Sequence, residues 1–396
     1  MKKKLLLILP FYLLALSLLA QTQQHVWYMD GQAIDFTGPT PVVTPVAGSN
    51  GGNNAGTYNG SNGTHDANGD LLFYVDANSV RDKNGVSGGS LSNYGSAYGD
   101  ISLIPVPDAP CQYYIIYKNG IFQYQPPCNN NAQHFNLSYS VYDVSSNMIV
   151  SNDNELDWCN SGGGNSITVG RLRPDNTRFL YEISTHGVNY EIKKYTISSI
   201  GISSSTTLLS ANFVNVNWQN TPEIDLSFQE DKLVFTNKGE EIYIVHLDIN
   251  GNLNTAFGAG GVTTHTIAGG NLSGVEFSPN GNNLFVGSVI SEIFLVNPVT
   301  GSFTTFGALS SPYGNSQLET AYDAGGNYNI YAVGNGGLGE ISNINSATPI
   351  FTPAVVPGVT SIGDINGVLM LPRQVDGEDY EESALPPNLS PTLDLF

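Results

Sequence analysis

The sequence predicts an all-β protein, a β-propeller of seven four-stranded blades, and three observations support this prediction. The composition combines 44 glycines and 21 tyrosines with 40% apolar and only 12% charged residues, which is typical of short strands joined by tight turns. A turn signature rich in Asp, Asn and Gly precedes one apolar strand after another. The signature recurs at intervals close to the length of a propeller blade.

The stretch GVEFSPNGNNLFVGS, Gly274 to Ser288, shows the signature most clearly. Two apolar runs are separated by Ser278-Pro279-Asn280-Gly281. Proline fixes φ for the second position of a β-turn, and glycine accepts a positive φ, so this tetrapeptide predicts a chain reversal between two strands. Two further strands follow before the next such signal, which makes four antiparallel strands in one unit.

The same signature recurs along the chain, and the successive gaps are 42, 67, 55, 50, 44 and 42 residues. Units of this length with four strands each are typical of propeller blades, which pack face to face around an axis. Seven signatures predict seven blades, and six blades is the alternative if the last signature precedes only a closing strand. The signatures lie at Asp66, Asp108, Asp175, Glu230, Asn280, Ala324 and Asn366.

The last signature is followed by one convincing strand, VLMLP, from Val368 to Pro372. We therefore expect the N-terminal segment His25 to Phe36, HVWYMDGQAIDF, to supply the missing strand and close the ring.

The chain divides into three regions. Residues 1–20 carry a basic start and an apolar run shorter than a comfortable membrane span, as in a cleaved secretory signal peptide, and an uncleaved anchor is the alternative. Residues 21–373 form the propeller domain, and residues 374–396 form a flexible acidic tail with several prolines. No integral membrane segment is expected once the signal peptide is removed.

The charge balance limits the partners. The chain has 14 Lys and Arg against 34 Asp and Glu, a net charge of -20. A phosphate backbone requires a basic patch, so nucleic acid is not an expected partner, and anionic membranes are disfavoured for the same reason. We expect an extracellular protein or a glycan as the partner of a monomeric chain.

The chain has three cysteines. The predicted signal peptide would export the chain to an oxidising compartment, where one disulfide is expected. Cys111 with Cys128 is the first candidate pair, and Cys128 with Cys159 is the alternative.

No catalytic constellation is visible, so we expect a non-enzyme. The stretch GVSGG, Gly85 to Gly89, matches the letters of a nucleophile elbow, which needs a strand before it and a helix after it. Here it follows the Lys83-Asn84-Gly85 turn and runs into more Gly and Ser, so a polar loop is expected. The six histidines are scattered without metal-ligand spacing. The alternative is a secreted glycan-active or peptide-modifying enzyme with its site at the central channel, where acidic residues with a histidine would be required.

Structural calcium is the one cofactor that the sequence suggests. Asp153, Asn154, Glu155 and Asp157 place oxygen ligands close together, as Ca²⁺ prefers. Acidic turns such as Asp248-x-Asn250-x-Asn252 carry a similar pattern, but Asp and Asn also form ordinary turns with their own backbone.

For ligand binding, the longer insertions are the candidate regions. They carry Trp158 with Asp157, and Trp218, which offer a stacking face and a polar contact. The alternative is that both tryptophans pack between blades.

Several stretches resemble the N-terminal propeller-like region of large secreted proteins of the Bacteroidetes group. They are WYMDGQAIDFTGPTPV, GTHDANGDLLFYVDANSVRDKNG, CQYYIIYKNG with LSYSVYDVSSN, and GVEFSPNGNNLFVGSVISEIFLVNPVTG, in the same order. The FSPNG stretch also resembles generic WD40-like and YVTN-type repeats. The family often carries PKD domains and a gliding-motility-type C-terminal sorting domain. The resemblance implies export, cell-surface or extracellular residence and a binding or adhesive role; since no sorting domain follows, the periplasm is the alternative location.

Overall fold

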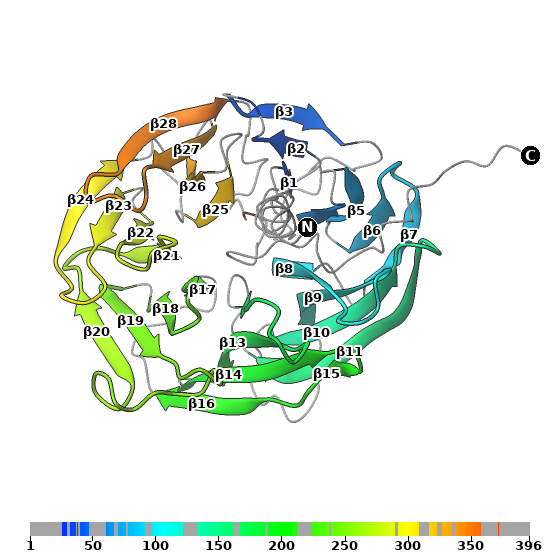
Figure 1. The fold of residues 1–396 in the computed structure, drawn as a ribbon, viewed down its shortest axis with the longest axis horizontal. Helices are drawn as coiled ribbons and strands as arrows, with labels where there is room; N and C mark the ends of the chain where they lie inside the picture. Colours follow the sequence, from blue (N-terminus) through cyan, green and yellow to red (C-terminus); the bar gives the residue numbers. More distant parts are fainter. Residues whose placement is uncertain are drawn as a thin grey trace, which may run out of the picture.

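The chain folds into seven antiparallel β-sheets that form a ring, as the computed structural model shows (Figure 1). The structure describes residues 26–29, 32–36, 38, 40–46, 61–66, 70–76, 78–91, 97–121, 134–160, 167–186, 189–211, 223–237, 239–289, 292–308, 317–322, 327–334, 337–357 and 371. These residues form 28 strands and no helix, so none of them belongs to a helix long and apolar enough to cross a membrane.

Each sheet is one blade, and the blades follow one another in chain order. Blade 1 consists of β1 (Val26–Met29), β2 (Gln32–Asp35) and β3 (Val42–Pro45). Blade 2 consists of β4 (Ser61–His65), β5 (Leu71–Asp76), β6 (Ser79–Asp82) and β7 (Ser87–Ser90). Blade 3 consists of β8 (Ala97–Pro105), β9 (Gln112–Ile121), β10 (His134–Asp143) and β11 (Met148–Asn160). Blade 4 consists of β12 (Ile167–Val169), β13 (Arg178–His186), β14 (Asn189–Ser198), β15 (Gly201–Ile202) and β16 (Thr206–Ala211).

The remaining three blades have four strands each. Blade 5 consists of β17 (Ile224–Leu226), β18 (Lys232–Thr236), β19 (Glu241–His246) and β20 (Val262–Thr266). Blade 6 consists of β21 (Leu272–Phe277), β22 (Leu284–Ser288), β23 (Glu292–Val296) and β24 (Phe303–Ala308). Blade 7 consists of β25 (Leu318–Tyr322), β26 (Tyr328–Gly334), β27 (Gly337–Ser342) and β28 (Ile350–Pro357).

Within a blade the strands pair in sequence order, and the first strand lies nearest the axis (Figure 1). In blade 4 the fourth position is shared by β15 and β16, which both pair with β14. The prediction of a seven-bladed propeller is therefore confirmed, and the alternative of six blades is wrong.

The predicted turn signatures mark the turn between the first and second strands of blades 2 to 6. The signature at Ala324, between β25 and β26 in the sequence, lies outside the described residues. In the stretch that showed the signature most clearly, the Gly281 N–H donates to the Ser278 carbonyl at 2.8 Å, and Gly281 has a φ of 68°. The corresponding turns of blades 3, 4 and 5 also contain a residue with positive φ, at Asp108, Asn176 and Glu230. The signature at Asn366 lies outside the described residues.

The N-terminal segment closes the ring between blades 7 and 2, but it contributes three strands rather than the one expected (Figure 1). Of the predicted closing strand only Leu371 is described. It is buried in one cluster with Trp27 and Ile34 of blade 1 and Leu338 of blade 7, and its N–H donates to the Gln317 side chain at 2.7 Å. The two ends of the described chain thus meet at this closure.

The hydrophobic core lies between the blades. Each of the six clusters of buried residues combines side chains of two neighbouring blades: 1 with 7, 2 with 3, 3 with 4, 4 with 5, 5 with 6, and 6 with 7. Blades 1 and 2 meet through aromatic rings, with Tyr28 and Tyr74 stacked at 6.4 Å. A single blade cannot bury both faces alone, so closure of the ring stabilises every blade.

Candidate binding cleft

Three acids in or next to the inner strands of blades 5 and 6 tie neighbouring blades together. Glu223 accepts the N–H of Val275 at 3.0 Å, and Asp225 accepts the N–H of Phe277 at 2.9 Å, both across the boundary between blades 5 and 6. Glu276 accepts the hydroxyl proton of Thr320 in blade 7. Among the described residues, no three His, Cys, Asp or Glu side chains gather where they could hold a metal ion.

The predicted calcium ligands all lie in β11, but each one has protein partners of its own. Asp153 accepts the Tyr117 hydroxyl, the Asn154 amide donates to Tyr139 O at 3.2 Å, and the Asn136 amide donates to Glu155 at 3.4 Å. Asp157 pairs with Lys193 at 2.7 Å and accepts the Ser184 hydroxyl at 2.6 Å. Burial raises the pKa of Asp153 and of Glu155, and the charge of Asp157 adds to the rise at Glu155. Calcium at this strand stays a prediction.

The other predicted residues are described only in part. Trp218 and Cys128 lie outside the described residues, and of Trp158 and Cys159 only the place in β11 is given. Cys111 is half-buried just before β9 and is a free thiol among the described residues. Its pairing with Cys128 stays a prediction.

Two further motifs turn out to be ordinary turns or strand. The Gly85 to Gly89 stretch runs from the β6–β7 turn into β7, the edge strand at the outer side of blade 2. The turn is followed by a strand and not by the helix that a nucleophile elbow requires. In the β19–β20 connection, Asp248 Oδ1 accepts the N–H groups of Asn250 and Asn252 at 2.8 and 2.9 Å. These hydrogen bonds lower the pKa of Asp248, with Asn252 as the largest cause.

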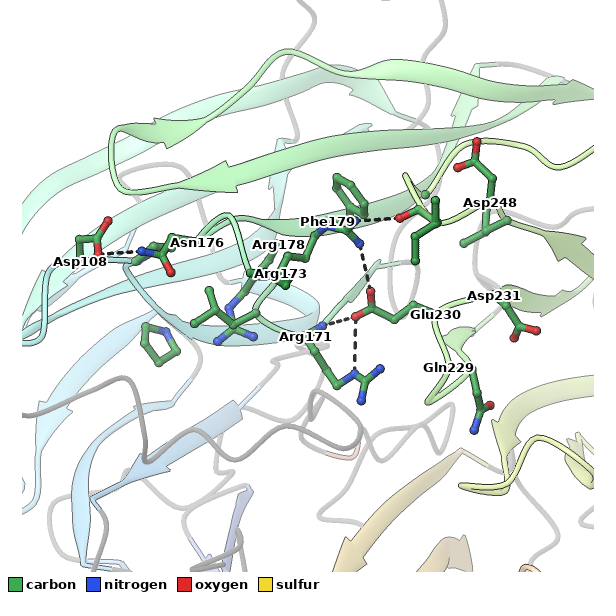
Figure 2. A pocket seen from close by; sticks show the side chains of 17 residues that line it. Asp108, Arg171, Arg173, Asn176, Arg178, Phe179, Gln229, Glu230, Asp231 and Asp248 are labelled. Atoms are coloured by element: carbon green, nitrogen blue, oxygen red, sulfur yellow. Dashed lines mark hydrogen bonds and ion pairs between the residues drawn. The ribbon is translucent and has the colours of Figure 1, made fainter. Parts of the chain in front are cut away.

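A cleft of about 890 Å³ lies where blades 3, 4 and 5 meet, and Figure 2 shows its side chains. Its walls come from the first turns of the three blades, β8–β9, β12–β13 and β17–β18, together with the β19–β20 connection of blade 5. The cleft therefore lies at the edge of the face where the predicted turn signatures project.

The sequence RLRPDNTR, Arg171 to Arg178, forms the blade 4 wall. Its turn is closed by the Arg173 N–H, which donates to Thr177 O at 2.8 Å, and by the Asn176 N–H, which donates to Arg173 O at 2.9 Å. The Asn176 amide reaches across to Asp108 of blade 3 at 3.0 Å. Arg171 and Arg173 thus lie along one short hairpin, and Arg178 is fully buried at its base.

Arg173 joins three parts of the cleft. One guanidinium nitrogen lies 3.7 Å from Glu230 Oε2, and the other donates to the Ile249 carbonyl at 2.8 Å. The guanidinium carbon lies 4.4 Å from the centre of the Phe179 ring, and the Lys194 ammonium lies 4.6 Å from the same centre. Arg173 and Lys194 thus both make cation–π contacts with the Phe179 ring, and these contacts stabilise the wall.

Lys194 also holds the β19–β20 connection. Its ammonium donates to Asn250 O at 2.9 Å and to Asn252 Oδ1 at 2.6 Å. Burial lowers the pKa of this lysine. Together with Arg173, it attaches the loop of blade 5 to blade 4.

Glu230 crosses from blade 5 to blade 4 and accepts the backbone N–H of Arg171 (Figure 2). The Arg171 side chain is 43% exposed and lies 3.9 Å from Glu230, a looser contact than those of Arg173. Glu230 itself has a φ of 55°, a region that non-glycine residues rarely adopt. The turn therefore holds this carboxylate against the two arginines.

The chemistry of the cleft suits recognition of a polar ligand. The described lining contains no Ser, Thr, Cys, His, Lys or Tyr, so it offers no hydroxyl, thiol or imidazole to a substrate. Its four carboxylates have partners: Glu230 the arginines, Asp108 an amide, Asp248 backbone N–H groups, and Asp231 the Ser227 hydroxyl and Lys232. Of the three arginines in the described lining, Arg171 is the most open to a ligand, since its side chain is 43% exposed against 19% for Arg173.

The sequence analysis used the cations only to argue against nucleic acid and anionic membranes, and it missed this site. Three of the five arginines of the chain lie within the eight residues from Arg171 to Arg178. In a chain with so few cations, that clustering is the signal that points to the cleft.

No family model and no curated protein matches the chain. Among solved structures, the chain is similar to the WD40 β-propeller domain of Doa1, with a TM-score of 0.44 and 11% sequence identity. The match covers 79% of this chain and 86% of that one. The class of protein is therefore the one that its own seven sheets define, a seven-bladed β-propeller.

Proposed function

We propose that this chain is a non-catalytic binding or adhesion module, secreted or at the cell surface, that recognises a protein or a glycan. The cleft between blades 3, 4 and 5 is its recognition site. The single observation that carries the proposal is that this cleft exposes an arginine beside walls whose other charged groups are already paired. Pockets that bind ligands characteristically combine a formed shape with a few polar groups in fixed positions.

The rigidity of the walls supports this function. Hydrogen bonds across blade boundaries fix the turns at Asn176, Glu230 and Asp248, so little order has to be gained when a ligand binds. Secretion rests on the signal-like sequence of residues 1–20.

A binding screen of the purified protein against extracellular matrix proteins and glycans, with and without calcium, tests the proposal. We expect a saturable ligand whose binding is weakened in Arg171→Gln. The matched control is Arg81→Gln, which removes an arginine of blade 2 that contacts its own turn at Gly85 O. Loss of binding in both variants, or in neither, would place the site elsewhere. Turnover of a bound compound would favour the alternative of a secreted enzyme.

A further inference from the structure

We propose that the cleft recognises a carboxylate of an acidic peptide segment, and that Arg171 is the residue that contacts it. This inference rests on the proposed function and names the ligand class of the same site. It follows from the distribution of cations, from the position of Glu230 and from the way the aromatic ring of the cleft is covered.

Cations concentrate at this cleft in a chain that is otherwise strongly acidic. Five of the 14 Lys and Arg line it or contact its lining residues: Arg171, Arg173, Arg178, Lys194 and Lys232. The lining also carries four carboxylates, so the charges at the cleft are close to balance, whereas the whole chain has a net charge of -20. An anionic group therefore meets less repulsion here than the net charge of the chain implies.

The five cations have different tasks. Arg173 and Lys194 are committed to the β19–β20 connection by short hydrogen bonds, and Arg178 is fully buried. Arg171 is 43% exposed, and its closest carboxylate contact, at 3.9 Å, is longer than a hydrogen bond. Its planar guanidinium can therefore form the paired hydrogen bonds that a carboxylate accepts.

Glu230 shows how a carboxylate fits here. Its two oxygens face Arg171 and Arg173, and one of them accepts the Arg171 backbone N–H. The protein thus holds a carboxylate of its own against the arginines when no ligand is bound. A ligand carboxylate that pairs with the outer side of Arg171 competes with Glu230 for the same positive charge.

The lining favours a peptide over an acidic sugar. Carbohydrate sites commonly use an open aromatic face, whereas Phe179, the one aromatic in the described lining, is covered by Arg173 and Lys194. Ile249 of the same lining is 82% exposed, and its carbonyl accepts a hydrogen bond from Arg173. An apolar side chain next to the acidic residue of a peptide would cover Ile249 while the carboxylate meets Arg171.

Fluorescence polarisation with labelled peptides tests this. The probes are short peptides, acetylated and amidated at their ends, in which Glu or Asp stands beside Leu or Ile, each paired with its Gln or Asn counterpart. We expect the acidic peptide to bind about tenfold more tightly than its amide counterpart, the range of a charge-assisted hydrogen bond. Arg171→Gln should abolish that difference, and Arg81→Gln should leave it unchanged.

Glu230→Gln provides a test with the opposite sign. It removes the competing charge but keeps an oxygen that can accept the Arg171 N–H, so we expect acidic peptides to bind about threefold more tightly. A misfolded variant cannot produce this gain. Raised salt should weaken binding of the acidic peptides only.

Equal binding of acidic and amide peptides, no binding of either, or binding of oligogalacturonate in their place would each overturn the inference. A ligand from the broad screen that depends on Arg171 but not on a carboxylate would also overturn it, while the proposed binding function would stand.

Discussion

Two ion pairs cross between neighbouring blades in opposite environments. Lys118 of blade 3 lies 3.3 Å from Glu182 of blade 4, and both side chains are 0% exposed. Arg171 of blade 4 lies 3.9 Å from Glu230 of blade 5, with the arginine 43% exposed. The partners are chemically alike, but the first pair is sealed in the inter-blade core and the second borders the cleft.

The surroundings explain the difference. Glu182 also accepts the Tyr195 hydroxyl at 2.7 Å, and burial raises the pKa of Tyr195, with Glu182 as a further cause. The lysine, the carboxylate and the hydroxyl thus provide one another's hydrogen-bond partners in a place where water is excluded. At the cleft, water can replace either partner, so Arg171 can exchange one anion for another. Burial, and not the type of ion pair, separates a structural contact from a site for ligands.

The largest expected effect is that of breaking the buried pair. Lys118→Met leaves the Glu182 charge uncompensated, and we expect it to lower the free energy of unfolding by about 3–5 kcal/mol. Urea unfolding measures the loss. Adding Glu182→Gln to the same chain should restore much of the stability. A loss below about 1 kcal/mol for the single variant would mean that this pair behaves like a surface pair.

Removing the hydroxyl from the same network should have a smaller effect. Tyr195→Phe leaves Glu182 with one hydrogen bond fewer, and we expect a loss of about 1–3 kcal/mol in the free energy of unfolding. Tyr114→Phe is the matched control, because its hydroxyl donates to a backbone carbonyl, that of Ser198, at 2.7 Å. Equal losses in the two variants would mean that a hydrogen bond to the buried carboxylate stabilises the fold no more than one to a backbone carbonyl.

The architecture could be predicted from the sequence because turns are local. Positive φ at Gly281 and Asn176 follows from the preferences of a few consecutive residues, and the spacing of such turns reveals the blade. That the N-terminal segment supplies three of the described strands, β1 to β3, could not be foreseen, since this depends on which distant segments Trp27 and Ile34 meet.

The cleft was harder to predict because it joins residues of three blades. Glu230 was recognised as a turn residue, but nothing near it in sequence indicates that its side chain reaches Arg171. The acids of β11 are adjacent in sequence, which suggests a metal site, and calcium there stays a prediction. The sequence does not show their partners on other strands: Asp153 accepts the Tyr117 hydroxyl of β9, and Asp157 pairs with Lys193 of β14.

A third test examines the exposed pair directly. Because solvent screens the contact, Glu230→Gln should change the free energy of unfolding by about 1 kcal/mol or less. High salt should reduce the difference between this variant and the unaltered protein, whereas it should leave the effect of Lys118→Met in place. A loss as large as that of Lys118→Met would show that Glu230 holds the blades together and is not available for exchange with a ligand.

The smallest expected effect concerns His246, whose register partner in blade 5 is Lys232 at the edge of the cleft. Burial, and then the charge of Lys232, lower the pKa of His246 below its usual value of 6.5, against the opposing charge of Asp231. The unfolded chain therefore binds a proton more readily, and stability falls as the pH drops below 6.5. We expect a loss of about 0.5 kcal/mol or less, because solvent screens a part-exposed ring. NMR titration of the imidazole measures this pKa. Lys232→Gln should raise it, because the variant removes a nearby positive charge. A pKa at or above 6.5 in the unaltered protein would contradict the prediction.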